Sequence, residues 1–110
     1  MSPADLDAIR HALAGGKVVF GPHARREMAG ENPTLLPAEI EEAVAGGEII
    51  EDYPDDPRGP CCLILGFSGP GRPVHTVVTA ARPEVFVITA YVPDPRRWED
   101  YRRRRTGGKA

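Results

Sequence analysis

The chain has 110 residues, of which 41% are hydrophobic and 27% are charged, and its formal net charge is −2. This composition is typical of one soluble globular domain with a modest core, and two adjacent cysteines exclude a disulfide framework. No apolar run, residues 85–88 included, is long enough to cross a membrane, and Asp5 and Asp7 interrupt the basic-then-apolar order of a signal peptide, so a cytoplasmic protein is expected.

Three helices are expected in the first half of the chain. The first begins after the capping residue Ser2 and ends at Gly15-Gly16, and residues 17–20 form a short apolar strand or an extended lead-in. Gly21-Pro22 starts a second helix, which reaches Met28. A third helix runs from Pro37 to Gly46-Gly47, with Ile40, Ala43 and Val44 as its apolar stripe.

Leu36 occupies the cap position of the third helix, where a hydroxyl or carboxamide normally accepts a backbone hydrogen bond. We therefore expect Leu36→Thr to stabilise the protein by roughly 0.5–1 kcal/mol, provided that Leu36 is not buried.

From Glu48 onward the apolar pattern is typical of strands. Four β-rich runs are separated by short clusters of Pro, Gly, Asp and Arg, and they cover residues 48–53, 61–67, 74–80 and 84–92. Short turns between consecutive strands predict an antiparallel meander. Asp94-Pro95 starts a last helix, on which Trp98, Tyr101 and Arg105 recur on one side, and residues 106–110 are expected to be frayed.

The predicted fold class is therefore α+β, in which N-terminal helices pack on one face of a four-stranded antiparallel sheet and a C-terminal helix follows. A single domain is expected over residues 1–105.

The charges are distributed unevenly along this domain. Residues 93–110 hold seven Lys or Arg against three Asp or Glu, whereas residues 1–92 hold seven against thirteen. An acidic body with a basic C-terminal end suits either a basic protein or a polyanion as a partner. Any contact with nucleic acid would depend on local basic patches, since the whole chain is acidic.

His75 is the first candidate for catalysis, because an imidazole exchanges protons near neutral pH. It lies in the third predicted strand. If the turn at Arg82-Pro83 pairs residues whose numbers sum to 165, His75 lies opposite Ala90; if a bulge shifts the sum to 166, it lies opposite Tyr91. The structural alternative is a buried or edge histidine that is hydrogen-bonded to backbone.

His23 is the second candidate and the better exposed one. It begins the second predicted helix, with Glu27 one turn later, and the neighbouring Arg25 and Arg26 are suited to a phosphate. The structural alternative is a polar helix start with solvated arginines.

The arginine run at residues 102–105 predicts a second phosphate contact, through Arg102 and Arg103 in particular. A solvated charged face is the alternative, and the Trp98/Tyr101 pair is more typical of a core than of a base-stacking platform. We expect no metal and no cofactor, because the cysteines and histidines lack the spacing of metal ligands and no glycine-rich phosphate loop is present.

Five motifs, taken together and in order, resemble a small bacterial family of unknown function that is similar to the RelE/ParE-like and MqsR-like toxins. They are F-G-P-H-A-R-R-E-M, E-E-A-V-A-G-G-E-I-I-E-D-Y-P, C-C-L-I-L-G, G-R-P-V-H-T-V-V and I-T-A-Y-V-P-D-P-R-R-W. The family's H-A-x-x-R-M motif falls on His23, Ala24, Glu27 and Met28, so that Glu27 stands where an arginine is usual. The family's histidine and tyrosine positions fall on His75 and Tyr91.

The resemblance implies a RelE-like fold and the function of a type II toxin, a metal-free mRNA endoribonuclease with His23, His75 and Tyr91 as catalytic residues. It also implies a cognate antitoxin as partner, of the zinc-finger type encoded beside similar proteins. Glu27 and the acidic body depart from the strongly basic RelE toxins. A non-catalytic protein-binding module of the same fold is the main alternative, and a toxin that poisons DNA gyrase is a third.

Overall fold

The computed structural model describes residues 6–79 and 84–105, which form three helices, a five-stranded sheet and a two-stranded hairpin. The helices are α1 (Leu6–Ala14), α2 (Pro22–Gly30) and α3 (Pro37–Ala45). The sheet strands are β1 (Val18–Phe20), β2 (Glu48–Tyr53), β3 (Cys61–Ser68), β4 (Arg72–Thr79) and β5 (Val85–Tyr91), and the hairpin strands are β6 (Trp98–Glu99) and β7 (Arg103–Arg104). The expected cap at Ser2, the turn at Arg82-Pro83 and the frayed tail at 106–110 lie outside the described residues.

The sheet has the order β1-β5-β4-β3-β2. Strands β2 to β5 form the predicted antiparallel meander, and β1 adds a fifth strand that pairs in parallel with β5, from Val18↔Val85 to Phe20↔Val87. The predicted α+β class is therefore confirmed. The predicted four-stranded antiparallel sheet is corrected to a mixed sheet of five strands, in which β2 to β5 are antiparallel and β1 is parallel to its neighbour. The lead-in at 17–20 forms a strand because the free edge of β5 offers it hydrogen-bond partners.

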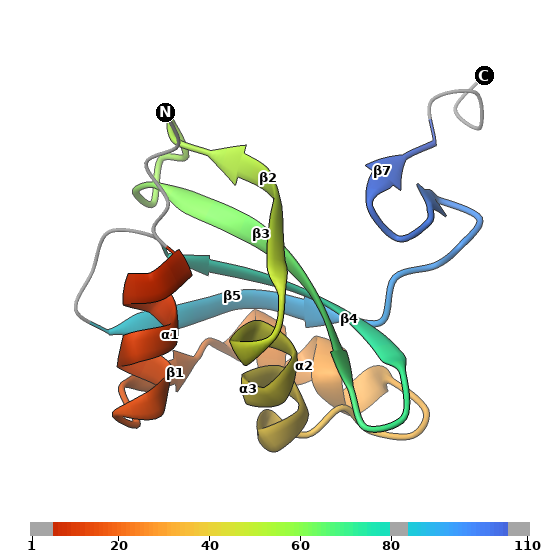
Figure 1. Cartoon of the computed structure of the whole chain (residues 1–110), viewed down its shortest axis with the longest axis horizontal. Helices are drawn as coiled ribbons and strands as arrows, with labels where there is room; N and C mark the ends of the chain where they lie inside the picture. The colour runs from red at the N-terminus through yellow and green to blue at the C-terminus, as the bar shows by residue number, and fades with distance from the viewer. Residues whose placement is uncertain (1–5, 80–83, 106–110) are drawn as a thin grey trace.

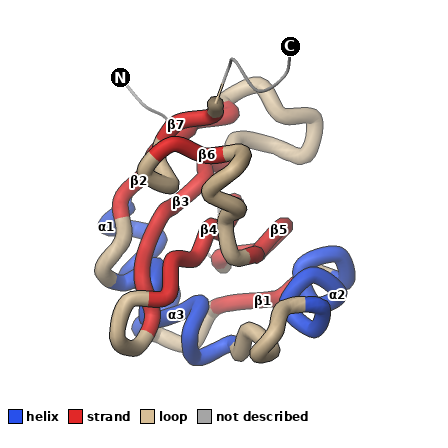
Figure 2. Tube along the Cα trace, turned by 90° about the vertical axis from the view of Figure 1, so that its right-hand side faces the viewer, coloured by secondary structure: helices blue, strands red, loops and turns tan. Residues whose placement is uncertain are grey.

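The three helices cover one face of the sheet, and the β6–β7 hairpin lies on the opposite side (Figures 1 and 2). The side chains of β3 point alternately toward the helices and toward the hairpin. Cys62 and Ile64 belong to the core against the helices, whereas Phe67 faces the hairpin and meets the ring of Tyr101 edge-on. Residues 61–66 are all buried, because both faces of this strand are covered over that stretch.

The main core lies between the helices and the sheet. It gathers one apolar stripe from each helix and the inward side chains of β3, β4 and β5; its members include Ile9, Leu13, Met28, Ile40, Val44, Ile64, Val78 and Val87. The approach of α3 to β3 is especially close at Gly66, where an added Cβ would lie 1.8 Å from the carbonyl oxygen of Ala43. Glycine at this position therefore allows the helix to pack directly on the strand.

The predicted C-terminal helix is wrong. The Asp94 side chain accepts the backbone N–H of Arg96, and its carbonyl oxygen accepts those of Arg97 and Trp98, so the chain turns here and then forms the β6–β7 hairpin. Asp100 and Tyr101 have positive φ angles of 56° and 61° in the hairpin turn. Contacts with the sheet outweigh the local helical pattern, as they can when propensity is weak.

Among the described residues, no helix combines the length and the apolar character needed to span a membrane.

Candidate functional site

His75 lies directly opposite Tyr91 on the face of the sheet that the hairpin covers. Residues from His75↔Tyr91 to Val77↔Thr89 pair with numbers that sum to 166, and the register then shifts at Val78↔Val87. The bulge alternative of the two predicted registers is therefore the one observed. The shift matters because it places the imidazole beside the phenol, rather than opposite Ala90 as an uninterrupted register with a sum of 165 would.

Both ring nitrogens of His75 have partners, although the side chain is fully buried at 0% exposure. Nε2 lies 2.7 Å from the carbonyl oxygen of Tyr101, and Nδ1 lies 3.2 Å from the hydroxyl of Tyr91. A carbonyl only accepts, so Nε2 carries the proton and donates it, and in the neutral ring Nδ1 accepts from the Tyr91 hydroxyl. Burial lowers the pKa of His75, which favours this neutral form.

The cover over His75 comes from the C-terminal segment. The ring of Trp98 stands nearly perpendicular to the imidazole, with centroids 4.4 Å apart, and the guanidinium of Arg104 lies 4.6 Å from the centre of that indole on a cation–π contact. Arg104 also forms hydrogen bonds of 2.9 and 3.1 Å to Glu51 on β2. The hairpin is thereby tied to the sheet above the histidine.

Glu51 receives a third hydrogen bond, from the hydroxyl of Tyr53. The partly buried Tyr53 phenol loses solvation and faces this carboxylate, and both effects raise its pKa to about 12. Tyr53 and Arg104 therefore hold the Glu51 carboxylate in place as the anchor of the hairpin.

Tyr91 connects the buried histidine with solvent. Its side chain lines a groove of about 810 Å³, which we call the arginine groove. The groove is lined by Glu27, Tyr91, Val92, Asp94, Arg96, Arg97, Trp98, Arg104 and Arg105. Partial burial raises the pKa of the Tyr91 phenol, so the hydroxyl stays protonated at neutral pH.

The four arginines of the groove differ in the hydrogen bonds that they already form within the protein. Arg96 forms two hydrogen bonds to Asp94, Arg104 is held by Glu51, and Arg105 donates to the carbonyl oxygen of Pro95 at 2.8 Å. The Arg97 guanidinium makes no hydrogen bond or ion pair with any residue that the structure describes. Four cations against two carboxylates leave the groove positive, as an anionic ligand requires.

His23 lies beside this groove, in the first turn of α2. Its side chain is 59% exposed, as expected, and Nε2 lies 3.5 Å from Oε1 of Glu27. The same Glu27 oxygen accepts the backbone N–H of Ala90 at 3.1 Å. Glu27 thus links α2 to the residue next to Tyr91, and His23 is at the rim while His75 is beneath the surface.

The other predicted phosphate ligands lie elsewhere. Arg25 donates to the carbonyl oxygen of Phe20 at 3.0 Å, and Arg26 is exposed on α2. Arg102 forms hydrogen bonds of 3.0 and 2.7 Å to Glu48, and Arg103 lies 3.3 Å from Glu99. Neither Arg102 nor Arg103 lines the arginine groove; Arg102 instead ties the hairpin to β2.

Sequence reasoning missed Arg96 and Arg97 as arginines of the groove. It included Arg104 and Arg105 in the predicted phosphate-binding run but emphasised Arg102 and Arg103, and it missed Glu51 as the anchor of the hairpin. The motif R-R-W after Asp94-Pro95 contains two of the groove arginines. Because the sequence predicts a helix there, it does not connect the motif with Tyr91. Within residues 6–79 and 84–105, no three His, Cys, Asp or Glu side chains are grouped so that they could hold a metal ion.

Comparisons with known proteins identify the family. Searches of the curated proteins and of the solved structures gave no match. A family model described as "Domain of unknown function (DUF4258)" matches residues 20–92, which include α2, α3 and all of β2 to β5. The chain therefore belongs to the DUF4258 family of domains of unknown function.

Proposed function

We propose that the protein cleaves RNA without a metal ion, as the toxin of a type II toxin–antitoxin pair. The observation that carries the proposal is Tyr91, which lines a groove with four arginines and whose hydroxyl is hydrogen-bonded to His75. The order of helices followed by an antiparallel meander agrees with the RelE-like fold that the sequence motifs imply. Under this proposal the partner is an antitoxin, of the zinc-finger type found beside similar proteins.

The hydrogen-bond directions suggest how the reaction would begin. Because Tyr91 donates its proton to Nδ1 of His75, the lone pairs of its oxygen remain free to accept another proton. The Tyr91 oxygen would take the proton of an RNA 2′-hydroxyl while its own proton passes to Nδ1. His75 then needs no contact with RNA, and its imidazolium would be stabilised by the Tyr101 carbonyl, which accepts from Nε2.

The rest of the reaction would use the rim of the groove. The 2′-oxygen forms a bond to phosphorus, the bond from phosphorus to the 5′-oxygen breaks, and a 2′,3′-cyclic phosphate and a 5′-hydroxyl result. His23, as imidazolium, would donate the proton that the leaving 5′-oxygen needs. Arg97 and Arg104 would stabilise the negative charge that grows on the phosphate oxygens.

Two assays test this proposal. Purified protein is incubated with single-stranded RNA in EDTA, and fragments are examined by mass spectrometry for 2′,3′-cyclic phosphate ends. Wild type, His23→Ala and Tyr91→Phe are also expressed in a bacterial host, where only the wild type should arrest growth. Absence of both cleavage and arrest for the wild type would refute the proposal. Growth arrest without cleavage, with loss of supercoiling activity, would favour a gyrase poison instead.

A protein-binding module of the same fold is the second candidate. Its support is that His75 is completely buried with both nitrogens bonded, an arrangement that also serves structure alone. This candidate predicts that Tyr91→Phe changes stability but no activity, and that the intact protein binds a basic protein partner without acting on RNA.

A further inference from the structure

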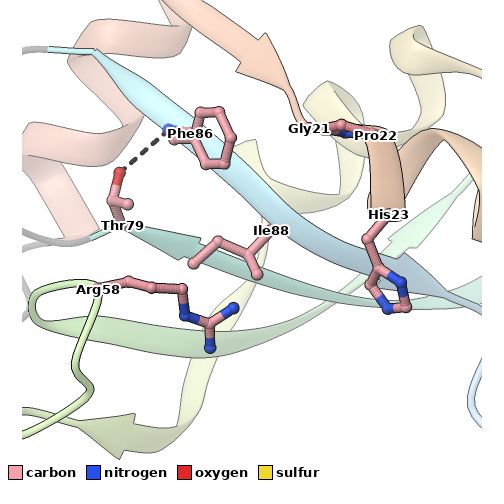
Figure 3. A pocket seen from close by; sticks show the side chains of 7 residues that line it. All are labelled: Gly21, Pro22, His23, Arg58, Thr79, Phe86 and Ile88. Carbon is pink, nitrogen blue, oxygen red and sulfur yellow. Dashed lines mark hydrogen bonds between the residues drawn. The ribbon is translucent and has the colours of Figure 1, made fainter.

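A second hollow lies on the same face of the sheet as Tyr91. Its volume is about 360 Å³, at the lower end of the range for small-molecule pockets, and Phe86, Ile88, Arg58 and His23 are in its lining (Figure 3). Val85 and Val87 point into the helix-side core, so Phe86 and Ile88 alternate with them onto the opposite face. We call this hollow the Phe86 pocket.

We propose that the Phe86 pocket binds one nucleobase of the single-stranded RNA whose phosphates lie in the arginine groove. The inference rests on the proposed function and adds a subsite to it. The pocket has the chemistry of a base-stacking site, since Phe86 supplies an aromatic ring and Ile88 an apolar floor. Among its polar groups, the Thr79 hydroxyl already accepts the backbone N–H of Phe86 at 3.0 Å.

Arg58 supplies a second flat surface. It stands across the pocket from Phe86, with Ile88 between them (Figure 3). Two hydrogen bonds of 2.8 Å to Asp56 hold the guanidinium in the turn between β2 and β3, and that pairing lowers the pKa of Asp56 to about 2. A guanidinium with a fixed orientation stacks on a base and also attracts the phosphate attached to it.

The two hollows adjoin each other through α2. His23 lines the Phe86 pocket and Glu27 lines the arginine groove, and their side chains lie 3.5 Å apart. An RNA chain that has one phosphate near Arg97 and Tyr91 therefore passes His23. Its next base then reaches Phe86. This places the proposed proton donor between the base subsite and the phosphate subsite.

Gly21 sets the position of the stacking ring. An added Cβ at Gly21 would lie 3.0 Å from Cζ of Phe86, and the backbone N–H of Gly21 donates to Val87 at 3.0 Å. The start of α2 thus packs against one edge of the ring, which limits its movement without covering the pocket.

The test compares binding of two fluorescein-labelled hexamers, oligouridylate and a ribose–phosphate chain without bases. Phe86→Leu keeps an apolar side chain and removes the aromatic face. Phe67→Leu is the matched control, since Phe67 is 43% exposed and lies outside both hollows. We expect Phe86→Leu to weaken oligouridylate binding about 5-fold or more, with no change for the base-free chain, and Phe67→Leu to change neither.

One possible result is that wild type, Phe86→Leu and Phe67→Leu bind oligouridylate with equal affinity and cleave RNA normally. That result would overturn the proposed base subsite and leave the proposed function intact. A wild type that neither binds nor cleaves RNA would overturn the proposed function. In that case uridine monophosphate is titrated while the Ile88 methyl resonances are followed. Shifts that disappear in Phe86→Leu would support a base site, and their absence would overturn it.

Discussion

The Tyr91 hydroxyl lies 3.2 Å from Nδ1 of His75, and the two residues face each other across β4 and β5. One partner is fully buried and the other lines a positively charged groove, so a proton has a direct path between the interior and the surface. The pair therefore links stability to the proposed chemistry, and both can be measured on the same variant.

Replacing Tyr91 with Phe removes the hydroxyl and keeps the ring. RNA cleavage should fall by about 100-fold or more, because the group that exchanges the proton is lost. The free energy of unfolding should fall by about 1–3 kcal/mol, since Nδ1 of His75 becomes a buried acceptor without a donor. Tyr53→Phe is the control, because its hydroxyl binds Glu51 outside the groove. Equal loss of cleavage in both variants would contradict the assignment.

Stability should decrease as the pH falls below 6.5, the ordinary value for a histidine, because burial lowers the pKa of His75 in the folded protein. In this range the unfolded chain binds a proton before the folded one does, so acid favours unfolding until the pH reaches the lower, folded pKa. The slope is at most about 1.4 kcal/mol per pH unit. Urea unfolding at pH 7.5, 6.5 and 5.5 measures it.

The pH slope should be smaller in His75→Asn, which lacks the buried imidazole. A slope that survives the loss of His75 would assign it to other groups.

Arg97→Gln should weaken RNA binding and reduce the steepness of its salt dependence by about one unit, because one phosphate contact is removed. Arg103→Gln is the matched control: it changes the same kind of side chain in the same segment, but outside the groove. Fluorescence anisotropy at several salt concentrations separates the two. If Arg103→Gln had the larger effect, RNA would follow the hairpin surface instead of the groove.

Gly66→Ala should destabilise the protein by about 3 kcal/mol or lose the folded state, because its Cβ would overlap the backbone of Ala43. Gly30→Ala is the control, since a Cβ there meets no atom within 4 Å. Thermal melts of both variants decide whether the close packing of α3 on β3 carries this much stability.

Leu36→Thr should raise the free energy of unfolding by roughly 0.5–1 kcal/mol. Leu36 is 54% exposed, so no core contact is lost, and its backbone N–H already binds Glu39, which is half of a capping box. A threonine hydroxyl would add the other half. Leu36→Ala lacks that hydroxyl and should give no such gain; an equal gain would show that removal of exposed apolar surface is the cause.

The sequence indicated the meander closely because local patterns determine it. The strand predicted at 48–53 has the same bounds in the structure, and the glycine pairs end α1 and α3 nearly where expected. Features that depend on residues far apart in the sequence could not be predicted from local patterns. The register of His75 was open between two values, and only the bulge between β4 and β5 decides it.

The C-terminal segment shows the same limit more strongly. The spacing of Trp98 and Tyr101 favours a helix, but each finds its contact across the fold, with His75 and with Phe67. The arginines of residues 102–105 look alike in sequence, yet Glu48 and Glu51 select Arg102 and Arg104 as hairpin anchors. Which of these arginines anchor the hairpin therefore depends on which carboxylates the sheet presents.

The family model ends at residue 92, and both Trp98 and the Tyr101 carbonyl, which contact the His75 ring from the hairpin, come after it. A chain shortened after Val92 should lose the Trp98 ring and the Tyr101 carbonyl from the surroundings of His75, so that solvent reaches the imidazole and burial lowers its pKa less.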